Sequence, residues 1–269
     1  MKEYIFQPTG IYYRINEFQI HRRTIIFIHG LSGCSSAWEP YEREFMDKYN
    51  LLCIDLRGHG CSRKYPEEKD YIVELFVKDI ERMVAHLQIK EFIVVSHSFG
   101  SIVSTGLIKN NPSKIKGAVF LAPVFEPKHS VRTETTLFLS GVISSLAKIF
   151  PISTKPGKRI DYSRFLPTSD WDMQRIWFDI GNTGVAIYLF CLNTLYRSMD
   201  DNFYNRLDLP VMIIHGKRDS YVSVEHSMQA AKKIPGAKFV SLPNADHMLI
   251  FNYPQEISKT MAIFFDSFY

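Results

Sequence analysis

The sequence predicts an α/β fold in which helices cover both faces of a mostly parallel sheet and a helical cap is inserted late in the chain. Runs of strand length that are apolar throughout, as in strands buried between two helix layers, occur at residues 24–28, 51–54, 92–95, 118–121 and 211–214. Segments of helical periodicity lie between these runs. Because strands and helices alternate, the sheet is expected to be mainly parallel.

The other elements follow from turn signals and periodicity. Residues 4–6 and 11–15 flank a Gln-Pro-Thr-Gly turn and predict a hairpin at the start of the chain, and residues 238–242 predict a shorter, more polar strand. Two helices are predicted where apolar side chains recur every three or four residues, the second opening at Pro254. Their apolar positions are Ile72, Phe76, Ile80, Met83, Val84 and Leu87, and then Ile257, Met261, Phe264, Phe265 and Phe268.

The alternation lapses over residues 124–208, a stretch too long for a loop in a compact domain and rich in aromatic side chains. We therefore expect a helical cap over the carboxyl edge of the sheet, where open α/β sheets bind ligands. The alternative is a helical layer that takes no part in substrate contact. The predicted domains are a core of residues 1–123 and 209–269 and a cap insertion of residues 124–208.

Membrane spans and secretion signals are not expected. Residues 136–150 are apolar with Lys148 as their one charge, but they fall short of the roughly 20 residues that cross a bilayer. A cap helix facing the core is favoured over one that makes peripheral contact with a lipid surface. The N-terminus lacks the apolar stretch of a signal peptide, so a cytoplasmic protein is expected.

Composition argues against several classes of partner. Hydrophobic residues make up 46% of the chain and charged residues 22%, as in ordinary globular proteins. The net charge of +4 comes from scattered basic residues, so no nucleic-acid partner is expected. The four cysteines have neither disulfide nor zinc-ligand spacing, which favours buried free thiols and no metal. They are Cys34, Cys53, Cys61 and Cys191.

Ser98 stands at the centre of the pentad Ser-His-Ser-Phe-Gly, directly after the apolar run at 92–95 and before a helix-like stretch. A serine nucleophile on a sharp strand-to-helix turn requires small residues two positions before and two after it, here Ser96 and Gly100. The pentad therefore makes Ser98 the candidate nucleophile.

Asp219 and His247 follow the strands predicted at 211–214 and 238–242, which puts both on the same sheet edge as Ser98. An imidazole can take the serine proton and return it to the leaving group, while a carboxylate orients the imidazole. We therefore expect a catalytic triad of Ser98, His247 and Asp219. Asp246 and Glu126 are weaker candidates for the acid.

An oxyanion hole requires two fixed hydrogen-bond donors. The backbone N–H of Phe99, directly after the candidate nucleophile, is expected to be one. The loop His29-Gly30-Leu31-Ser32-Gly33 is expected to supply the other, preferably from Leu31 and less favourably from Ser32.

These motifs resemble the capped α/β-hydrolase superfamily, in particular carboxylesterases and monoacylglycerol lipases. The chain carries the pentad around Ser98, whose sharp strand-to-helix turn is called the nucleophile elbow in this family, and the His29-Gly30 pair. Residues 55–62 match the family segment D-x-R-G-x-G-x-S. The chain order Ser, Asp, His is also that of this family. In the family the segment at 55–62 is structural, so the resemblance implies no catalytic role for Asp55, Arg57 or His59.

The resemblance implies a serine hydrolase that cleaves small-molecule carboxylic esters through an acyl-enzyme, without a cofactor. Relatives that open epoxides or remove halides carry an aspartate at the elbow, where this chain has Ser98. The aromatic cap predicts a largely apolar acyl or alcohol group. The alternatives are a carbon–carbon bond hydrolase, an acyltransferase, and a ligand receptor with a vestigial triad.

Overall fold

A computed structural model of the chain describes residues 1–125, 134–197 and 207–267. The described residues form an eight-stranded sheet with the order β1-β2-β4-β3-β5-β6-β7-β8. Its strands are β1 (Lys2–Phe6), β2 (Ile11–Ile15), β3 (Thr24–Ile28), β4 (Asn50–Ile54), β5 (Phe92–His97), β6 (Ile115–Leu121), β7 (Val211–Gly216) and β8 (Lys238–Leu242).

The pairing of the strands confirms the predicted sheet. β1 and β2 form the antiparallel hairpin, β2 runs antiparallel to β4, and every pairing from β4 through β8 is parallel. The carboxyl ends of β5, β7 and β8 therefore share one edge. β5 continues two residues beyond the predicted run, because Ser96 and His97 still pair with Phe120 and Leu121 of β6. The apolar pattern missed them because both side chains are polar.

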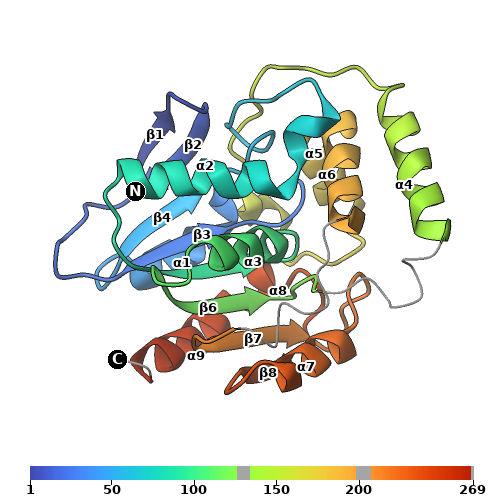
Figure 1. The fold of residues 1–269 in the computed structure, drawn as a ribbon. Helices are drawn as coiled ribbons and strands as arrows, with labels where there is room; N and C mark the ends of the chain where they lie inside the picture. Colours follow the sequence, from blue (N-terminus) through green and yellow to red (C-terminus); the bar gives the residue numbers. More distant parts are fainter. Residues whose placement is uncertain (126–133, 198–206, 268–269) are drawn as a thin grey trace.

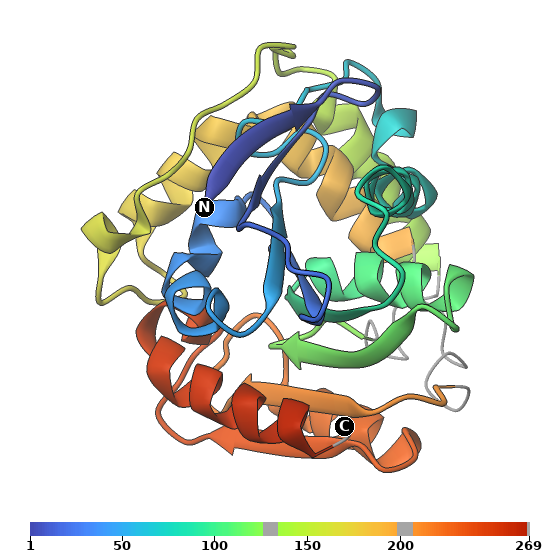
Figure 2. The same ribbon diagram turned by 90° about the vertical axis from the view of Figure 1, so that its left-hand side faces the viewer.

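Helices cover both faces of the sheet, as expected (Figures 1 and 2). The α-helices are α1 (Glu39–Phe45), α2 (Val73–His86), α3 (Gly100–Asn110), α4 (Glu134–Ala147), α5 (Met173–Thr183), α6 (Val185–Arg197), α7 (Val224–Lys233), α8 (Leu249–Asn252) and α9 (Pro254–Asp266). Short 3-10 helices are η1 (Ser35–Trp38), η2 (Glu68–Tyr71) and η3 (Tyr162–Phe165). Phe268, predicted on the last helix, lies outside the described residues.

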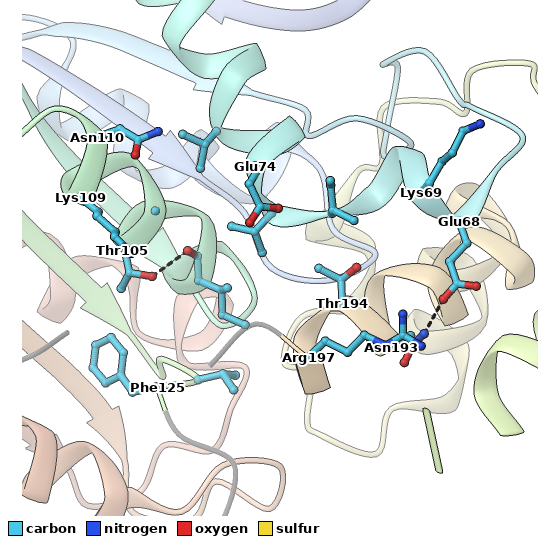
Figure 3. A pocket seen from close by; sticks show the side chains of 16 residues that line it. Glu68, Lys69, Glu74, Thr105, Lys109, Asn110, Phe125, Asn193, Thr194 and Arg197 are labelled. Carbon is cyan, nitrogen blue, oxygen red and sulfur yellow. Dashed lines mark hydrogen bonds between the residues drawn. The ribbon is translucent and has the colours of Figure 1, made fainter. Parts of the chain in front are cut away.

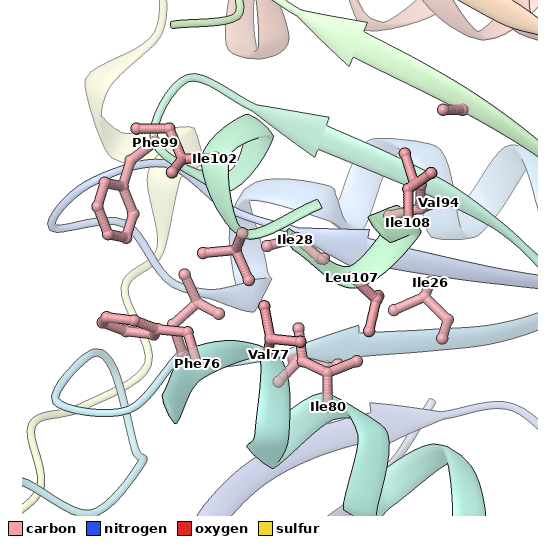
Figure 4. Close-up of a cluster of buried hydrophobic side chains, with 14 of the residues drawn as sticks. Ile26, Ile28, Phe76, Val77, Ile80, Val94, Phe99, Ile102, Leu107 and Ile108 are labelled. Atoms are coloured by element: carbon pink, nitrogen blue, oxygen red, sulfur yellow. The ribbon is translucent and has the colours of Figure 1, made fainter. Parts of the chain in front are cut away.

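Alternate residues of each central strand serve two separate cores, because successive side chains point to opposite faces of a sheet. In β3, Ile26 and Ile28 pack in the core beneath α2 and α3, whereas Ile25 and Phe27 pack in the core beneath α1 and α9. Figure 4 shows the first core, where side chains of α2 and α3 meet those of β3 and β5. Burial on both faces explains why these strands are apolar throughout.

The segment at 55–62 has a structural role here. The Asp55 carboxylate accepts the N–H of Ser35 at 2.6 Å and the N–H of Cys61 at 2.7 Å, and so joins two loops. Arg57 donates two hydrogen bonds to the Asp79 carboxylate on α2, and both side chains are buried. These contacts hold the loop after β4 in place without contributing to the site at Ser98.

Helices α4, α5 and α6 come between β6 and β7 in the chain and lie beyond the carboxyl ends of the strands (Figure 1). Among the described residues, no helix has both the length and the apolar character needed to cross a bilayer.

The expectation that residues 136–150 direct their apolar side chains toward the core is wrong for the described part of this helix. Small and polar side chains form its inner side instead: Arg197 of α6 donates to Ser140 at 2.8 Å, and Asn193 of α6 donates to Ser144 at 2.9 Å. These hydrogen bonds fix which side of α4 faces inward. The apolar side chains left exposed are Val142, Leu146, Ile149 and Phe150.

Candidate active site

Ser98 occupies the turn between β5 and α3 with a backbone φ of +50°, in the left-handed region that side chains rarely adopt. Its N–H donates to Leu121 O at 3.0 Å, which ties the turn to β6. The turn tolerates little bulk: a Cβ on residue 100 would lie 2.7 Å from the carbonyl oxygens of Ile28 and His29. Such strained backbone is typical of functional sites, where surrounding structure holds it in place.

His247 and Asp219 extend from Ser98 in one line of hydrogen bonds. Ser98 Oγ lies 2.8 Å from His247 Nε2, and His247 Nδ1 lies 2.6 Å from Asp219 Oδ2. The loop after β7 supplies Asp219, and the loop after β8 supplies His247. All three predicted side chains thus meet at the carboxyl edge of the sheet, although distant stretches of sequence contribute them.

Hydrogen-bond donors surround the Asp219 carboxylate. Its Oδ1 accepts the backbone N–H groups of Tyr221 and Val222 at 2.9 and 2.8 Å, and His215 Nε2 lies 2.9 Å from its Oδ2. Burial by itself would raise the pKa of Asp219, but hydrogen bonds from His215 and His247 outweigh it and lower that pKa below its ordinary value. The carboxylate is therefore charged at neutral pH. A charged carboxylate keeps the proton of the His247 ring on Nδ1 and leaves Nε2 free to accept from Ser98.

Of the two weaker candidates for the acid, the structure describes Asp246. Asp246 turns away from the His247 ring: its carboxylate accepts the N–H groups of Met248 at 3.0 Å and Asp170 at 3.2 Å. Glu126 lies outside the described residues.

The predicted oxyanion donors lie beside Ser98. Phe99 directly precedes α3, and the loop after β3 lies against the elbow, since a Cβ on Gly30 would be 3.3 Å from Ser98 Cβ. In the described part of the chain, the N–H groups of Phe99 and Leu31 donate to no protein acceptor. Ser32, the weaker candidate, has a φ of +61° and a buried hydroxyl.

Several residues that were not singled out from the sequence contact Ser98, His247 or Asp219, among them His97, Asp170, His215 and Tyr221. His97 Nε2 lies 3.0 Å from the His247 carbonyl oxygen, and burial, with the adjacent His247, lowers the pKa of His97 to about 3. The Tyr221 ring stands edge-on to the His247 ring, with 5.2 Å between centroids. His215 could have been found from the sequence, because it is a polar residue directly after the apolar run at 211–214. Asp170 carried none, because its partners are 50 and 77 residues away.

A cavity of about 730 Å³ opens elsewhere, between α2, α3 and α6 (Figure 3). Glu68 and Asn193, joined by a hydrogen bond, line one end, and Lys109 and Asn110 line the other. Among the described residues that line it, none belongs to the triad.

Comparisons with known proteins agree with the fold described above. The family model for the alpha/beta hydrolase fold matches residues 23–254. The Arabidopsis thaliana protein named "Probable lysophospholipase BODYGUARD 1" is 26% identical over 261 residues, which cover 85% of this chain and 55% of that protein. The chain thus spans about half the length of this relative. The (E)-2-((N-methylformamido)methylene)succinate hydrolase of Acinetobacter baylyi is 21% identical over 90% of each chain. An alpha/beta hydrolase enzyme from a Medee basin deep-sea metagenome library has a similar structure, with a TM-score of 0.77, 17% identity and coverage of 99% of this chain and 98% of its own.

Proposed function

The chain belongs to the α/β-hydrolase family, and on that basis we propose that it is a serine hydrolase that cleaves carboxylic esters with a largely apolar acyl or alcohol group. One observation carries the proposal: the continuous hydrogen bonds from Ser98 through His247 to Asp219, at 2.8 and 2.6 Å. A serine hydroxyl is a weak nucleophile at neutral pH unless an adjacent base takes its proton.

Acylation begins when Ser98 Oγ attacks the ester carbonyl carbon while its proton passes to His247 Nε2. Asp219 stabilises the imidazolium that forms and stays ionised throughout. The carbonyl oxygen gains a negative charge, which the N–H groups of Phe99 and Leu31 stabilise. When the tetrahedral intermediate collapses, the C–O bond to the alcohol breaks and His247 returns its proton to the departing oxygen.

Deacylation repeats these steps with water as the nucleophile. His247 takes a proton from the water as the water oxygen attacks the acyl carbon. The second tetrahedral intermediate then expels Ser98 Oγ, which recovers its proton from His247. The carboxylic acid leaves, and the enzyme returns to its starting state.

The side chains beside His247 support an apolar substrate. Trp171 and Tyr221 pack edge to face with 5.5 Å between ring centroids, and Tyr221 in turn contacts the His247 ring. The Trp171 side chain is 67% exposed, so much of its apolar surface is available to a ligand. Because Trp171 belongs to residues 124–208, we assign this segment as the cap, with residues 1–123 and 209–269 as the hydrolase core. The relative named as a lysophospholipase is consistent with a lipid-like ester.

Labelling with a fluorophosphonate tests the proposal, because this probe reacts with activated serines. The purified protein is incubated with the probe, and hydrolysis of p-nitrophenyl acetate and butyrate is measured in parallel. We expect one probe mass on the Ser98 peptide and hydrolysis of both esters, and loss of both signals in Ser98→Ala. Folded protein that neither takes up the probe nor hydrolyses the esters would overturn the proposal and favour a ligand receptor. Labelling without hydrolysis would favour a carbon–carbon hydrolase or an acyltransferase.

A further inference from the structure

Asp170, on the loop that precedes α5, is a carboxylate that is 3% exposed and hydrogen-bonded to both catalytic loops. Its Oδ1 accepts the backbone N–H of His247 at 2.8 Å. Its Oδ2 accepts both the N–H and the hydroxyl of Ser220, at 2.8 and 2.7 Å. Asp170 thus contacts one triad residue directly and the immediate neighbour of another.

The backbone of Asp170 strengthens the same connection. Its N–H donates to Asp246 at 3.2 Å, and its carbonyl oxygen accepts the Tyr221 hydroxyl. One residue of the inserted segment therefore contacts His247 and the residue before it, Asp246, together with Ser220 and Tyr221, the two residues after Asp219.

The loop that carries Asp170 is itself anchored to the core. Asn252 on α8 accepts the N–H of Thr168 at 3.1 Å and donates to the Thr168 carbonyl at 2.7 Å. These reciprocal bonds fix the loop two residues before Asp170. A buried carboxylate with several donors forms strong, charge-assisted hydrogen bonds, so the linkage is stiff.

We propose that Asp170 is a positioning residue, which sets the separation of the loops carrying His247 and Asp219 and thereby the alignment of the His247 ring with Ser98. The inference rests on the proposed function, since it assigns to Asp170 the task of aligning that triad. It follows that the triad reaches its full alignment only when the inserted segment is docked on the core. The segment then contributes to catalysis itself as well as covering the site.

Kinetics of paired variants test this inference. In Asp170→Ala we expect kcat for p-nitrophenyl butyrate and the labelling rate with a fluorophosphonate to fall by about tenfold to a hundredfold, because displacing a reacting group by ~1 Å has an effect of this size. KM is expected to stay within about twofold of the parent value, because the Asp170 carboxylate is buried and occupied by His247 and Ser220. Asp170→Asn should lose less activity, because its amide oxygen can still accept the His247 N–H.

Asp172→Ala is the matched control. Asp172 lies on the same loop and accepts the N–H groups of Gln174 and Arg175 at the start of α5, both at 3.1 Å, and the Thr168 hydroxyl at 3.0 Å. Among the described residues, its side chain contacts neither catalytic loop, and its removal leaves the two backbone bonds between Thr168 and Asn252 in place. We expect this variant to melt at a lower temperature, because an N-cap contributes about 1 kcal/mol, and to keep its kcat. If Asp172→Ala lost as much kcat as Asp170→Ala, the effect would come from destabilising the segment, and the positioning role would be wrong.

Proton NMR separates this inference from the proposed function. The Nδ1 proton of His247, in its short hydrogen bond to Asp219, should give a far-downfield resonance whether or not the protein hydrolyses esters. We expect that resonance in the parent and in Asp172→Ala, and its loss or marked upfield shift in Asp170→Ala. An unchanged resonance in folded Asp170→Ala would overturn the inference even if the parent were an active esterase. Its loss in that variant would support the positioning role even if the parent hydrolysed no ester.

Discussion

Gly100→Ala perturbs the elbow through one methyl group. A Cβ at this position would lie 2.7 Å from two backbone carbonyl oxygens, well inside the 3.4 Å at which ordinary van der Waals contact begins. Neither oxygen belongs to a flexible side chain, so the first turn of α3 must move away from β3. Overpacking of this kind costs about 1–3 kcal/mol.

The same displacement should reduce activity, because it moves the Phe99 N–H and Ser98 relative to His247. We expect kcat for p-nitrophenyl butyrate to fall about tenfold to a hundredfold. Thermal unfolding should occur at a lower temperature, by roughly 2–4 °C for each kcal/mol lost. The assays are ester hydrolysis and calorimetry on the purified variant.

Gly141→Ala is the control for the effect of an added methyl group. Gly141 lies within α4, and a Cβ there would meet no atom within 4 Å. We expect this variant to keep its kcat and to gain about 0.5–1 kcal/mol of stability, because alanine favours a helix. A Gly100→Ala protein with the activity and melting temperature of the parent would refute the steric reasoning.

Three further predictions concern stability, pH and specificity. Asp79→Ala should lower the free energy of unfolding, measured by urea denaturation, by about 3–5 kcal/mol, because the buried Arg57 guanidinium loses its carboxylate partner. Glu91→Ala is the control: it removes an exposed ion pair with Lys116 and should lower the free energy of unfolding by less than about 1 kcal/mol. Burial lowers the pKa of His59 from 6.5 to about 4, so the unfolded chain takes up a proton that the folded chain does not. As the pH falls from 6.5 to 4, this histidine should therefore lower the free energy of unfolding by about 1.4 kcal/mol per pH unit. In His59→Gln the free energy of unfolding should depend less steeply on pH over this range, and an unchanged dependence would contradict the prediction. Trp171→Ala should lower kcat/KM for p-nitrophenyl decanoate by about fivefold, which corresponds to roughly 1 kcal/mol of lost apolar contact. The value of kcat/KM for p-nitrophenyl acetate should not change. Equal losses for both esters would show that Trp171 does not contact the acyl chain.

The sheet could be predicted because its central strands are buried on both faces, and each of them therefore appears in the sequence as a short run of apolar residues. That Ser98, Asp219 and His247 come together could be predicted for a related reason: each follows a recognisable strand, and parallel strands end at one edge. Their positions needed no knowledge of contacts within the inserted segment.

Asp170 and the orientation of α4 could not be predicted, because tertiary contacts determine both. Asp170 resembles any loop aspartate until the loops carrying Ser220 and His247 approach it. Residues 136–150 are apolar enough to suggest a core-facing helix. Hydrogen bonds from Asn193 and Arg197, on another helix, instead turn the serines of α4 inward.

Trapping the acyl-enzyme tests the central claim most directly. The protein is mixed with p-nitrophenyl butyrate, quenched in acid within the first turnover, and digested for peptide mass mapping. We predict one butyryl group on the Ser98 peptide of the parent and none on that peptide in Asp219→Asn or His247→Ala. Product released in an initial burst while the butyryl group sits on another residue, or an undiminished Ser98 adduct in both variants, would contradict the account.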